Sequence, residues 1–188
     1  MSKPNRYEIR IAGFGGQGVV TIGKILGIAF SVHDRKNSVN TQSYGPESRG
    51  GACRSEVVVS NSEINYPYVR KADVFIALSQ IALDTYISDL KPGGILVVDP
   101  NSVESVPGKD LYRIYEVPTV EISYKIGDFK YQNCVALGAL YPLIKDLLKK
   151  SSLQKAIEES VPPETREINL TAFESGLEYI EAHYPKKD

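Results

Sequence analysis

Six consecutive residues near the start of the chain, Gly13-Phe14-Gly15-Gly16-Gln17-Gly18, have the types and spacing of a phosphate-binding turn. They match the pattern G-x-G-x-x-G, follow a strand-like segment at residues 7–12, and precede apolar residues at helical spacing. Glycines in such a turn let backbone N–H groups approach an anion at a helix N-terminus, where the helix dipole favours negative charge. The candidate ligand- or phosphate-contacting residues of this turn are Gly13, Gly15, Gly16, Gln17 and Gly18.

A dinucleotide site would need one more residue than this turn supplies. An acidic side chain for the ribose hydroxyls is expected about 20 residues further on, at the end of the second strand. Asp34 has nearly that spacing but precedes the polar, strand-like segment 36–42, and the next acidic residue is Glu47. A tight strand-to-helix crossover without a nucleotide is therefore at least as well supported as NAD binding.

A second glycine-rich loop, QSYGPESRGG at residues 42–51, could bind an anion as well. The Arg49 guanidinium and the backbone donors of the adjacent glycines suit a carboxylate or a phosphate. The alternative is a solvent-exposed loop in which Arg49 pairs with Glu47 or Glu56, and composition does not separate the two. The candidates from this loop are Tyr44, Gly45, Arg49, Gly50 and Gly51.

Residues for covalent catalysis or for a metal centre are few. The chain has only Cys53 and Cys134, without CxxC spacing, and only His33 and His183. An iron–sulfur cluster needs four thiolates and a structural zinc usually needs four N or S ligands, so we expect no metal site and two buried thiols. We assign no catalytic residue, because no nucleophile stands in a motif with a base.

Composition limits the class of protein. The 188 residues are 42% hydrophobic and 24% charged with a net charge of -1, as in one folded domain and unlike a basic nucleic-acid binder. No apolar run reaches the ~18 to 20 residues of a membrane helix, and MSKPNRYEIR contains no apolar signal core. We expect a cytoplasmic protein that binds neither nucleic acid nor membrane.

Alternating strand and helix patterns indicate βαβ units and an α/β, Rossmann-like three-layer sandwich with a mostly parallel sheet. Strands are expected at residues 7–12, 36–42, 53–60, 72–78, 95–98 and 111–117, and helices from residue 19 to about 30 and at 79–89, 133–149 and 151–160. Ser151 and Gln154 fit a capping box, and Asn169 is the expected cap of a last helix. The loops at 13–18 and 79–80 should border one crevice at the carboxyl ends of the strands.

The segments IAGFGGQGVVTIGKIL and NTQSYGPESRGGACRSEVVVS closely resemble the gamma subunit of the 2-oxoacid:ferredoxin oxidoreductases, and the likeness continues through ADVFIALSQIALDTY, LKPGGILVVD and NCVALGAL. It implies that residues 1–188 form one gamma domain, inactive alone. It also implies alpha, beta and delta partner subunits that hold thiamine diphosphate and [4Fe-4S] clusters, with CoA as co-substrate and ferredoxin as electron acceptor.

Within this family, QSYGPESRGGACRSEVVVS is more similar to the 2-oxoglutarate-specific gamma subunit than to the pyruvate one. The resemblance therefore implies the oxidation of 2-oxoglutarate with CoA to succinyl-CoA and CO2. The alternatives are the pyruvate, branched-chain 2-oxoacid or indolepyruvate enzymes, a nucleotide-binding regulatory module, or a scaffold subunit without a site. We hypothesise that both glycine-rich loops face the shared active-site cavity, where they help to place CoA or the 2-oxoacid.

Overall fold

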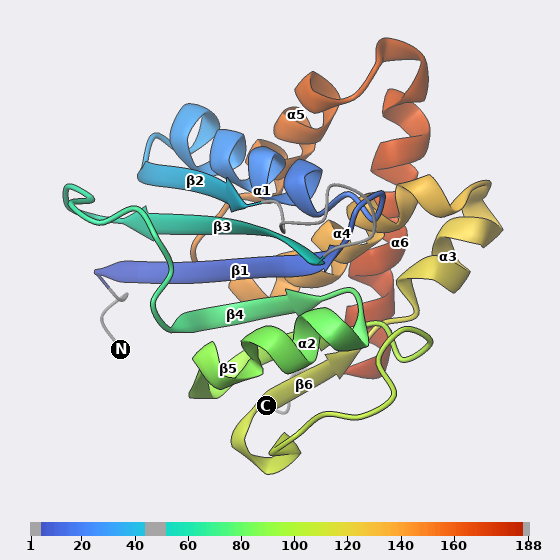
Figure 1. The fold of residues 1–188 in the computed structure, drawn as a ribbon. Helices are drawn as coiled ribbons and strands as arrows, with labels where there is room; N and C mark the ends of the chain where they lie inside the picture. The colour runs from blue at the N-terminus through green and yellow to red at the C-terminus, as the bar shows by residue number, and fades with distance from the viewer. Residues whose placement is uncertain (1–4, 44–51, 186–188) are drawn as a thin grey trace.

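The structure is a computed structural model that describes residues 5–43 and 52–185. Its centre is a six-stranded sheet in the order β2-β3-β1-β4-β5-β6 (Figure 1). The strands are β1 (Arg6–Phe14), β2 (Asn37–Ser43), β3 (Ala52–Ser60), β4 (Ala72–Ala77), β5 (Leu90–Val98) and β6 (Arg113–Glu116). β1, β4, β5 and β6 are parallel, whereas β3 is antiparallel to both β1 and β2. The predicted α/β class with a mostly parallel sheet is confirmed.

Helices cover the two faces of the sheet unequally (Figure 1). The α-helices are α1 (Val19–Ile28), α2 (Gln80–Tyr86), α3 (Thr119–Ile126), α4 (Gln132–Ile144), α5 (Lys150–Ser160) and α6 (Arg166–His183). One apolar cluster joins α1, α4, α5 and α6 to one face of the sheet, and a smaller cluster joins α2 to the other. The sequence pattern did not predict α3.

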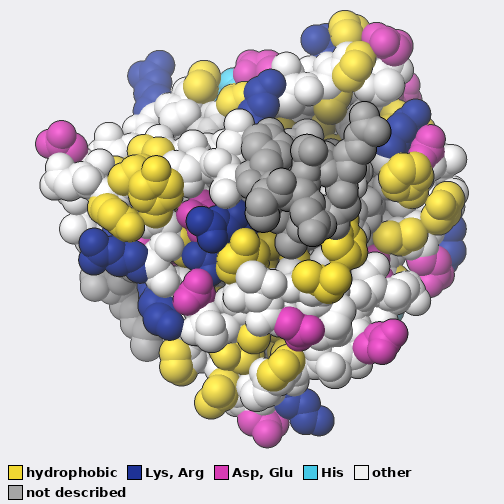
Figure 2. Space-filling model, viewed as in Figure 1, with side chains coloured by type: hydrophobic (Ala, Val, Ile, Leu, Met, Phe, Trp, Pro, Cys, Tyr) yellow, Lys and Arg dark blue, Asp and Glu magenta, His cyan; other side chains and the backbone are white. Residues whose placement is uncertain are grey.

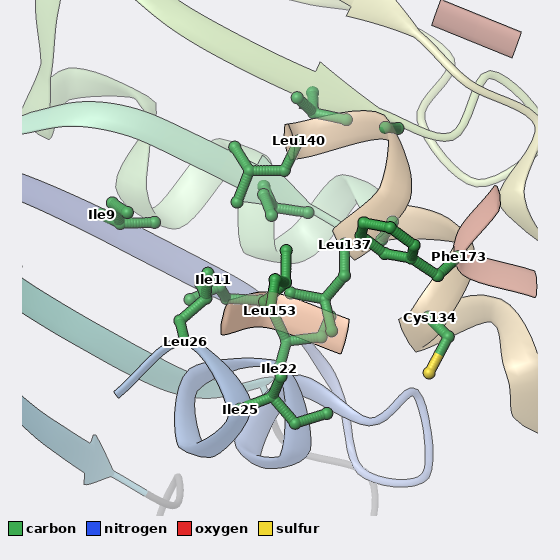
Figure 3. Close-up of a cluster of buried hydrophobic side chains, with 14 of the residues drawn as sticks. Ile9, Ile11, Ile22, Ile25, Leu26, Cys134, Leu137, Leu140, Leu153 and Phe173 are labelled. Carbon is green, nitrogen blue, oxygen red and sulfur yellow. The ribbon is translucent and has the colours of Figure 1, made fainter. Parts of the chain in front are cut away.

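The larger cluster shows how the strand and helix patterns meet. Alternate residues of β1, including Ile9 and Ile11, face Ile22 and Leu26 of α1 and Leu137 of α4 (Figure 3). Burying an aliphatic side chain of this kind is worth about 1.5–3 kcal/mol. The burial of these side chains fixes α1 against β1, and with it the glycine turn between them.

Helices α4 and α6 cross at two glycines. A Cβ atom at Gly138 would lie 1.8 Å from the carbonyl oxygen of Phe173, and one at Gly176 would lie 2.0 Å from that of Val135. Only glycine allows the two backbones to come this close. This crossing holds α4 in place against α6.

Two predicted helix caps are wrong. α5 begins at Lys150 after Lys149, and the Ser152 hydroxyl and the Lys149 N–H both donate to the carboxylate of Asp34. α6 begins at Arg166, so Asn169 lies inside the helix, where it accepts a hydrogen bond from the Cys134 thiol. The expected helix 133–149 ends at Ile144. The contacts of Asp34 with the start of α5 and of Asn169 with Cys134 join segments far apart in the sequence, which local patterns do not predict.

Candidate functional site

The glycine turn lies where β1 ends and α1 begins, at the carboxyl edge of the parallel strands. Gly16 and Gly18 have φ angles of 95° and 75°, a region that favours glycine. A Cβ atom at Gly13 would lie 2.9 Å from the Leu78 Cβ atom. These three glycines are therefore required by the turn and by its approach to the neighbouring strand, whereas a Cβ atom at Gly15 would meet nothing within 4 Å.

Gln17, predicted as a ligand contact, uses its side chain to hold the turn. Its Oε1 accepts the backbone N–H of Phe14 at 2.6 Å, and its Nε2 donates to the carbonyl of Leu78 at 2.7 Å. Leu78 in turn donates its N–H to Ala12. The loops after β1 and β4 thus border the same edge, as predicted, and Gln17 positions the turn.

Two helices begin side by side at this place. α1 has Gly18 as its N-cap, with no side-chain cap and no acidic residue in its first turn. α4 continues the short 3-10 helix Phe129–Tyr131, and the Cys134 N–H in its first turn is accepted by the Asn133 side chain. A Cβ atom at Gly18 would lie 2.7 Å from the Cβ of Asn133, so the two N-termini are in contact. Their dipoles make the spot favourable for an anion.

Asn133 is a polar side chain of this site that the sequence reasoning missed. It is 8% exposed, and its Oδ1 accepts the N–H of Cys134 at 2.8 Å. That bond fixes Nδ2 as the free end of the amide, with no partner in residues 5–43 and 52–185. A Cβ atom built on Gly18 would lie 3.0 Å from Nδ2, so this donor points at the glycine turn. The sequence signal was a polar pair, Gln132-Asn133, directly before the long apolar helix.

Residues 44–51 of the second predicted loop lie outside the described residues, and with them its candidates Tyr44, Gly45, Arg49, Gly50 and Gly51, whereas Gln42 and Ser43 belong to β2. One of the alternatives for Arg49 is nevertheless informed by the structure. Glu56 is buried and accepts a hydrogen bond from Arg10 at 2.9 Å, so it already has a cationic partner.

Asp34, the one acidic residue near the spacing of a ribose-binding carboxylate, has a different role. Both of its carboxylate oxygens accept hydrogen bonds at the start of α5, from Lys149 and Ser152. The carboxylate therefore joins the start of α5 to the end of the helical segment Ala29–His33, which follows α1.

The two thiols are buried, as predicted. Burial raises the pKa of Cys134 to about 12, and it raises the pKa of Cys53, which lies opposite Gly13 in the sheet register. Both therefore stay protonated at neutral pH, which makes them poor nucleophiles. His33 faces Glu159 and His183 stacks on Tyr179, so neither imidazole reaches a cysteine in the described chain.

No three His, Cys, Asp or Glu side chains in the described ranges gather where they could hold a metal ion. No helix within the same ranges is long and apolar enough to cross a bilayer.

Comparisons with known proteins agree closely with one another. Residues 8–179 match the family described as pyruvate ferredoxin/flavodoxin oxidoreductase. The chain is 46% identical over 181 residues to the 2-oxoglutarate synthase subunit KorC of Methanothermobacter thermautotrophicus, covering 93% of this chain and 95% of the relative. It is 30% identical over 177 residues to the pyruvate synthase subunit PorC of the same species, covering 93% and 96%.

Solved structures share the fold. The gamma subunit of a keto/oxoacid ferredoxin oxidoreductase from Geobacter sulfurreducens superposes with a TM-score of 0.83 at 38% identity, covering 94% of this chain and 99% of that one. The 2-oxoglutarate:ferredoxin oxidoreductase of Magnetococcus marinus, with 2-oxoglutarate, coenzyme A and succinyl-CoA bound, superposes with a TM-score of 0.86 at 23% identity. The superposition covers 98% of this chain and 32% of that longer chain. At this identity, the likeness shows the fold.

Proposed function

The chain belongs to the pyruvate ferredoxin/flavodoxin oxidoreductase family, and from this premise we propose that it is the gamma subunit of a 2-oxoglutarate:ferredoxin oxidoreductase. The complex converts 2-oxoglutarate, CoA and oxidised ferredoxin into succinyl-CoA, CO2 and reduced ferredoxin. The observation that carries the substrate is the 46% identity to a 2-oxoglutarate synthase subunit over nearly the whole chain, against 30% to the pyruvate counterpart of the same species.

The part of this subunit in the reaction is to bind and orient an anionic group. We propose that the glycine turn, the N-termini of α1 and α4 and the Asn133 amide receive a phosphate of CoA or a carboxylate of the 2-oxoacid. Support comes from the uncapped N-terminus of α1, from its contact with the start of α4, and from an amide donor held by its bond to Cys134. Arg49 would add a bidentate guanidinium from the second loop.

Thiamine diphosphate and the iron–sulfur clusters are assigned to partner subunits in this proposal. Thiamine diphosphate supplies decarboxylation and the clusters supply electron transfer to ferredoxin. The two cysteines of this chain are fewer than the four thiolates of a cluster, which supports the assignment. The alpha, beta and delta subunits are the proposed partners in a cytoplasmic complex.

The test is reconstitution with the partner subunits. The complete complex should reduce ferredoxin or a viologen dye when given 2-oxoglutarate and CoA, and a complex lacking this chain should not. Pyruvate, 2-oxoisovalerate and indolepyruvate serve as the competing substrates. Faster turnover of any one of these than of 2-oxoglutarate would contradict the substrate assignment.

A nucleotide-binding regulatory module is the competing class, and a binding experiment separates it. The isolated chain is titrated with NAD, NADP and CoA by calorimetry. We expect no tight dinucleotide binding, because Asp34 is bonded to the start of α5 and cannot hold a ribose. Dinucleotide binding tighter than CoA binding would reverse the order of the two hypotheses.

A further inference from the structure

The face of the sheet that carries α2 has an unusual exposed feature. Between β3 and β4 the chain runs as an extended segment, and Tyr66 and Tyr68 on it are 42% and 51% exposed. Their rings meet edge to face with centroids 5.6 Å apart, and the Arg70 guanidinium lies 4.3 Å from the centre of the Tyr66 ring. We call Tyr66, Tyr68 and Arg70 the tyrosine ladder. It is a contiguous aromatic and cationic surface with no cover in the described chain.

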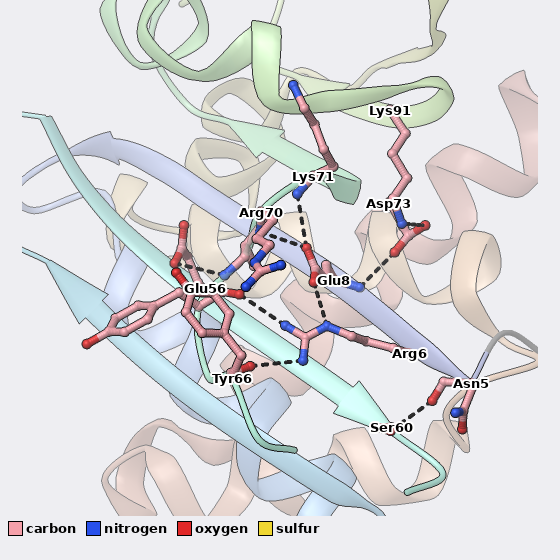
Figure 4. A network of polar contacts seen from close by, with 12 residues as sticks. Asn5, Arg6, Glu8, Glu56, Ser60, Tyr66, Arg70, Lys71, Asp73 and Lys91 are labelled. Carbon is pink, nitrogen blue, oxygen red and sulfur yellow. Dashed lines mark hydrogen bonds and ion pairs between the residues drawn. The ribbon is translucent and has the colours of Figure 1, made fainter. Parts of the chain in front are cut away.

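Hydrogen bonds from Arg6 and to Glu8 fix the backbone of the ladder. The Arg6 guanidinium donates to the carbonyls of Tyr66 and Tyr68 at 2.9 and 3.0 Å, and it pairs with Glu8 at 2.6 Å (Figure 4). Glu8 also accepts the backbone N–H groups of Arg70 and Lys71. A surface whose backbone is already fixed loses little conformational entropy when a partner binds. Exposed tyrosines on a fixed backbone are typical of protein–protein interfaces.

Charges of both signs lie near the ladder, and the partly exposed carboxylate, Asp89, is paired with Lys71 and with the buried Arg10. The carboxylates of Glu8 and Glu56 are buried and bonded inward, to Arg6 and Arg10. The side chains of Arg70 and Lys71, in contrast, are exposed. Figure 2, which views this face, shows hydrophobic side chains next to Lys and Arg side chains on its left side. A complementary partner surface is therefore apolar at its centre and acidic at its rim.

The backbone of the ladder lies away from the glycine turn. Arg6, which holds it, is the first residue of β1, and the glycine turn follows Phe14 at the other end of that strand. Eight steps along a strand span roughly 26 Å at 3.3 Å per residue. The Tyr68 side chain, in contrast, lines a small pocket with Arg54 and with Ser43 at the end of β2. A partner that contacts Tyr66 and Arg70 therefore need not touch an anion at the turn.

We propose that the tyrosine ladder is a docking surface for an acidic face of a partner subunit of the complex. The inference rests on the proposed function, which requires partner subunits. It is consistent with this chain being matched to 32% of a longer chain in the Magnetococcus marinus enzyme, where further protein is joined to the same fold. Tyrosine and arginine are among the residues that contribute most to binding energy in such contacts.

The experiment uses the co-expressed complex, purified through a tag on a partner subunit and diluted while dissociation of this chain is followed by mass photometry. Tyr66→Ser with Tyr68→Ser should raise the dissociation constant at least tenfold. Tyr124→Ser is the matched control, since Tyr124 is 62% exposed on α3, away from the ladder, and should change it less than twofold. Melting of each isolated variant checks its fold.

Charge is tested separately, in case the double variant folds poorly. Arg70→Glu should weaken association more than Arg70→Ala does, and 0.5 M salt should reduce that difference because it screens exposed charges. Equal dissociation constants for the wild type, the double variant and Arg70→Glu would overturn the docking surface and leave the proposed function intact. A raised KM for CoA with unchanged association would also overturn it, by making the ladder a ligand site. A wild-type chain that never joins the partner subunits would overturn the proposed function itself.

Discussion

Replacing Asn133 by aspartate separates the stability of the fold from the binding of an anion. The carboxylate keeps an acceptor for the Cys134 N–H and stands at two helix N-termini, which favour negative charge by about 0.3–1 kcal/mol each. Burial of the charge opposes this gain. We expect the free energy of unfolding of the isolated chain to change by no more than about 1 kcal/mol, a typical effect of a single substitution.

Anion binding should respond much more strongly. The variant loses one hydrogen bond from Nδ2 to a charged group, worth about 1.5–3 kcal/mol, which is roughly a 10- to 150-fold change. It also places like charges together, which at about 5 Å and an effective dielectric constant of about 20 costs about 3 kcal/mol more. The KM of the complex for CoA or for 2-oxoglutarate should therefore rise at least tenfold.

Steady-state kinetics of the complex and urea unfolding of the isolated chain measure the two quantities. Asn169→Asp is the control, because Asn169 is buried in α6 and its Nδ2 donates to Thr165, away from the turn. It should lower stability and leave both KM values unchanged, the reverse of Asn133→Asp. If Asn133→Asp leaves both KM values within twofold of the wild type in an intact complex, Asn133 does not bind the anion and the reasoning is refuted.

Three further outcomes are expected. Gly138→Ala should destabilise the isolated chain by about 3 kcal/mol or more in urea, because its Cβ would lie 1.8 Å from the Phe173 carbonyl, while Gly15→Ala, with open space around it, should change stability by less than about 1 kcal/mol. Arg49→Lys keeps the charge but loses the fork, so it should raise one KM roughly 10- to 150-fold if Arg49 clamps an anion, and should weaken assembly on gel filtration if it only braces the loop. Burial raises the pKa of Cys134 from 9.0 to about 12, so the thiol loses its proton at a lower pH in the unfolded chain than in the folded one. The free energy of unfolding should therefore fall as pH rises from about 9 to 12. Cys134→Ala should reduce that fall, as measured by urea unfolding at each pH.

Local sequence by itself determined the strand, turn and helix that build the site. The pattern at residues 13–18 can be interpreted without a structure because positive φ angles select glycine whatever the rest of the chain does. The run 74–77 of β4 is apolar throughout because central parallel strands are covered on both faces. The resemblance carried by the same segments gave the family, which the comparisons confirm.

Only the tertiary structure decided which polar side chains serve the site and which serve the fold. The sequence offers Gln17 as a candidate ligand contact, and in the structure both ends of its side-chain amide bond Phe14 and Leu78, the latter 61 positions away. Asp34 holds the start of α5, and Asn133 reaches Gly18 from a helix more than a hundred residues further along the chain. A hydrogen bond depends on which groups the folded chain brings within about 3 Å, and sequence spacing carries that information only for neighbours a few residues apart.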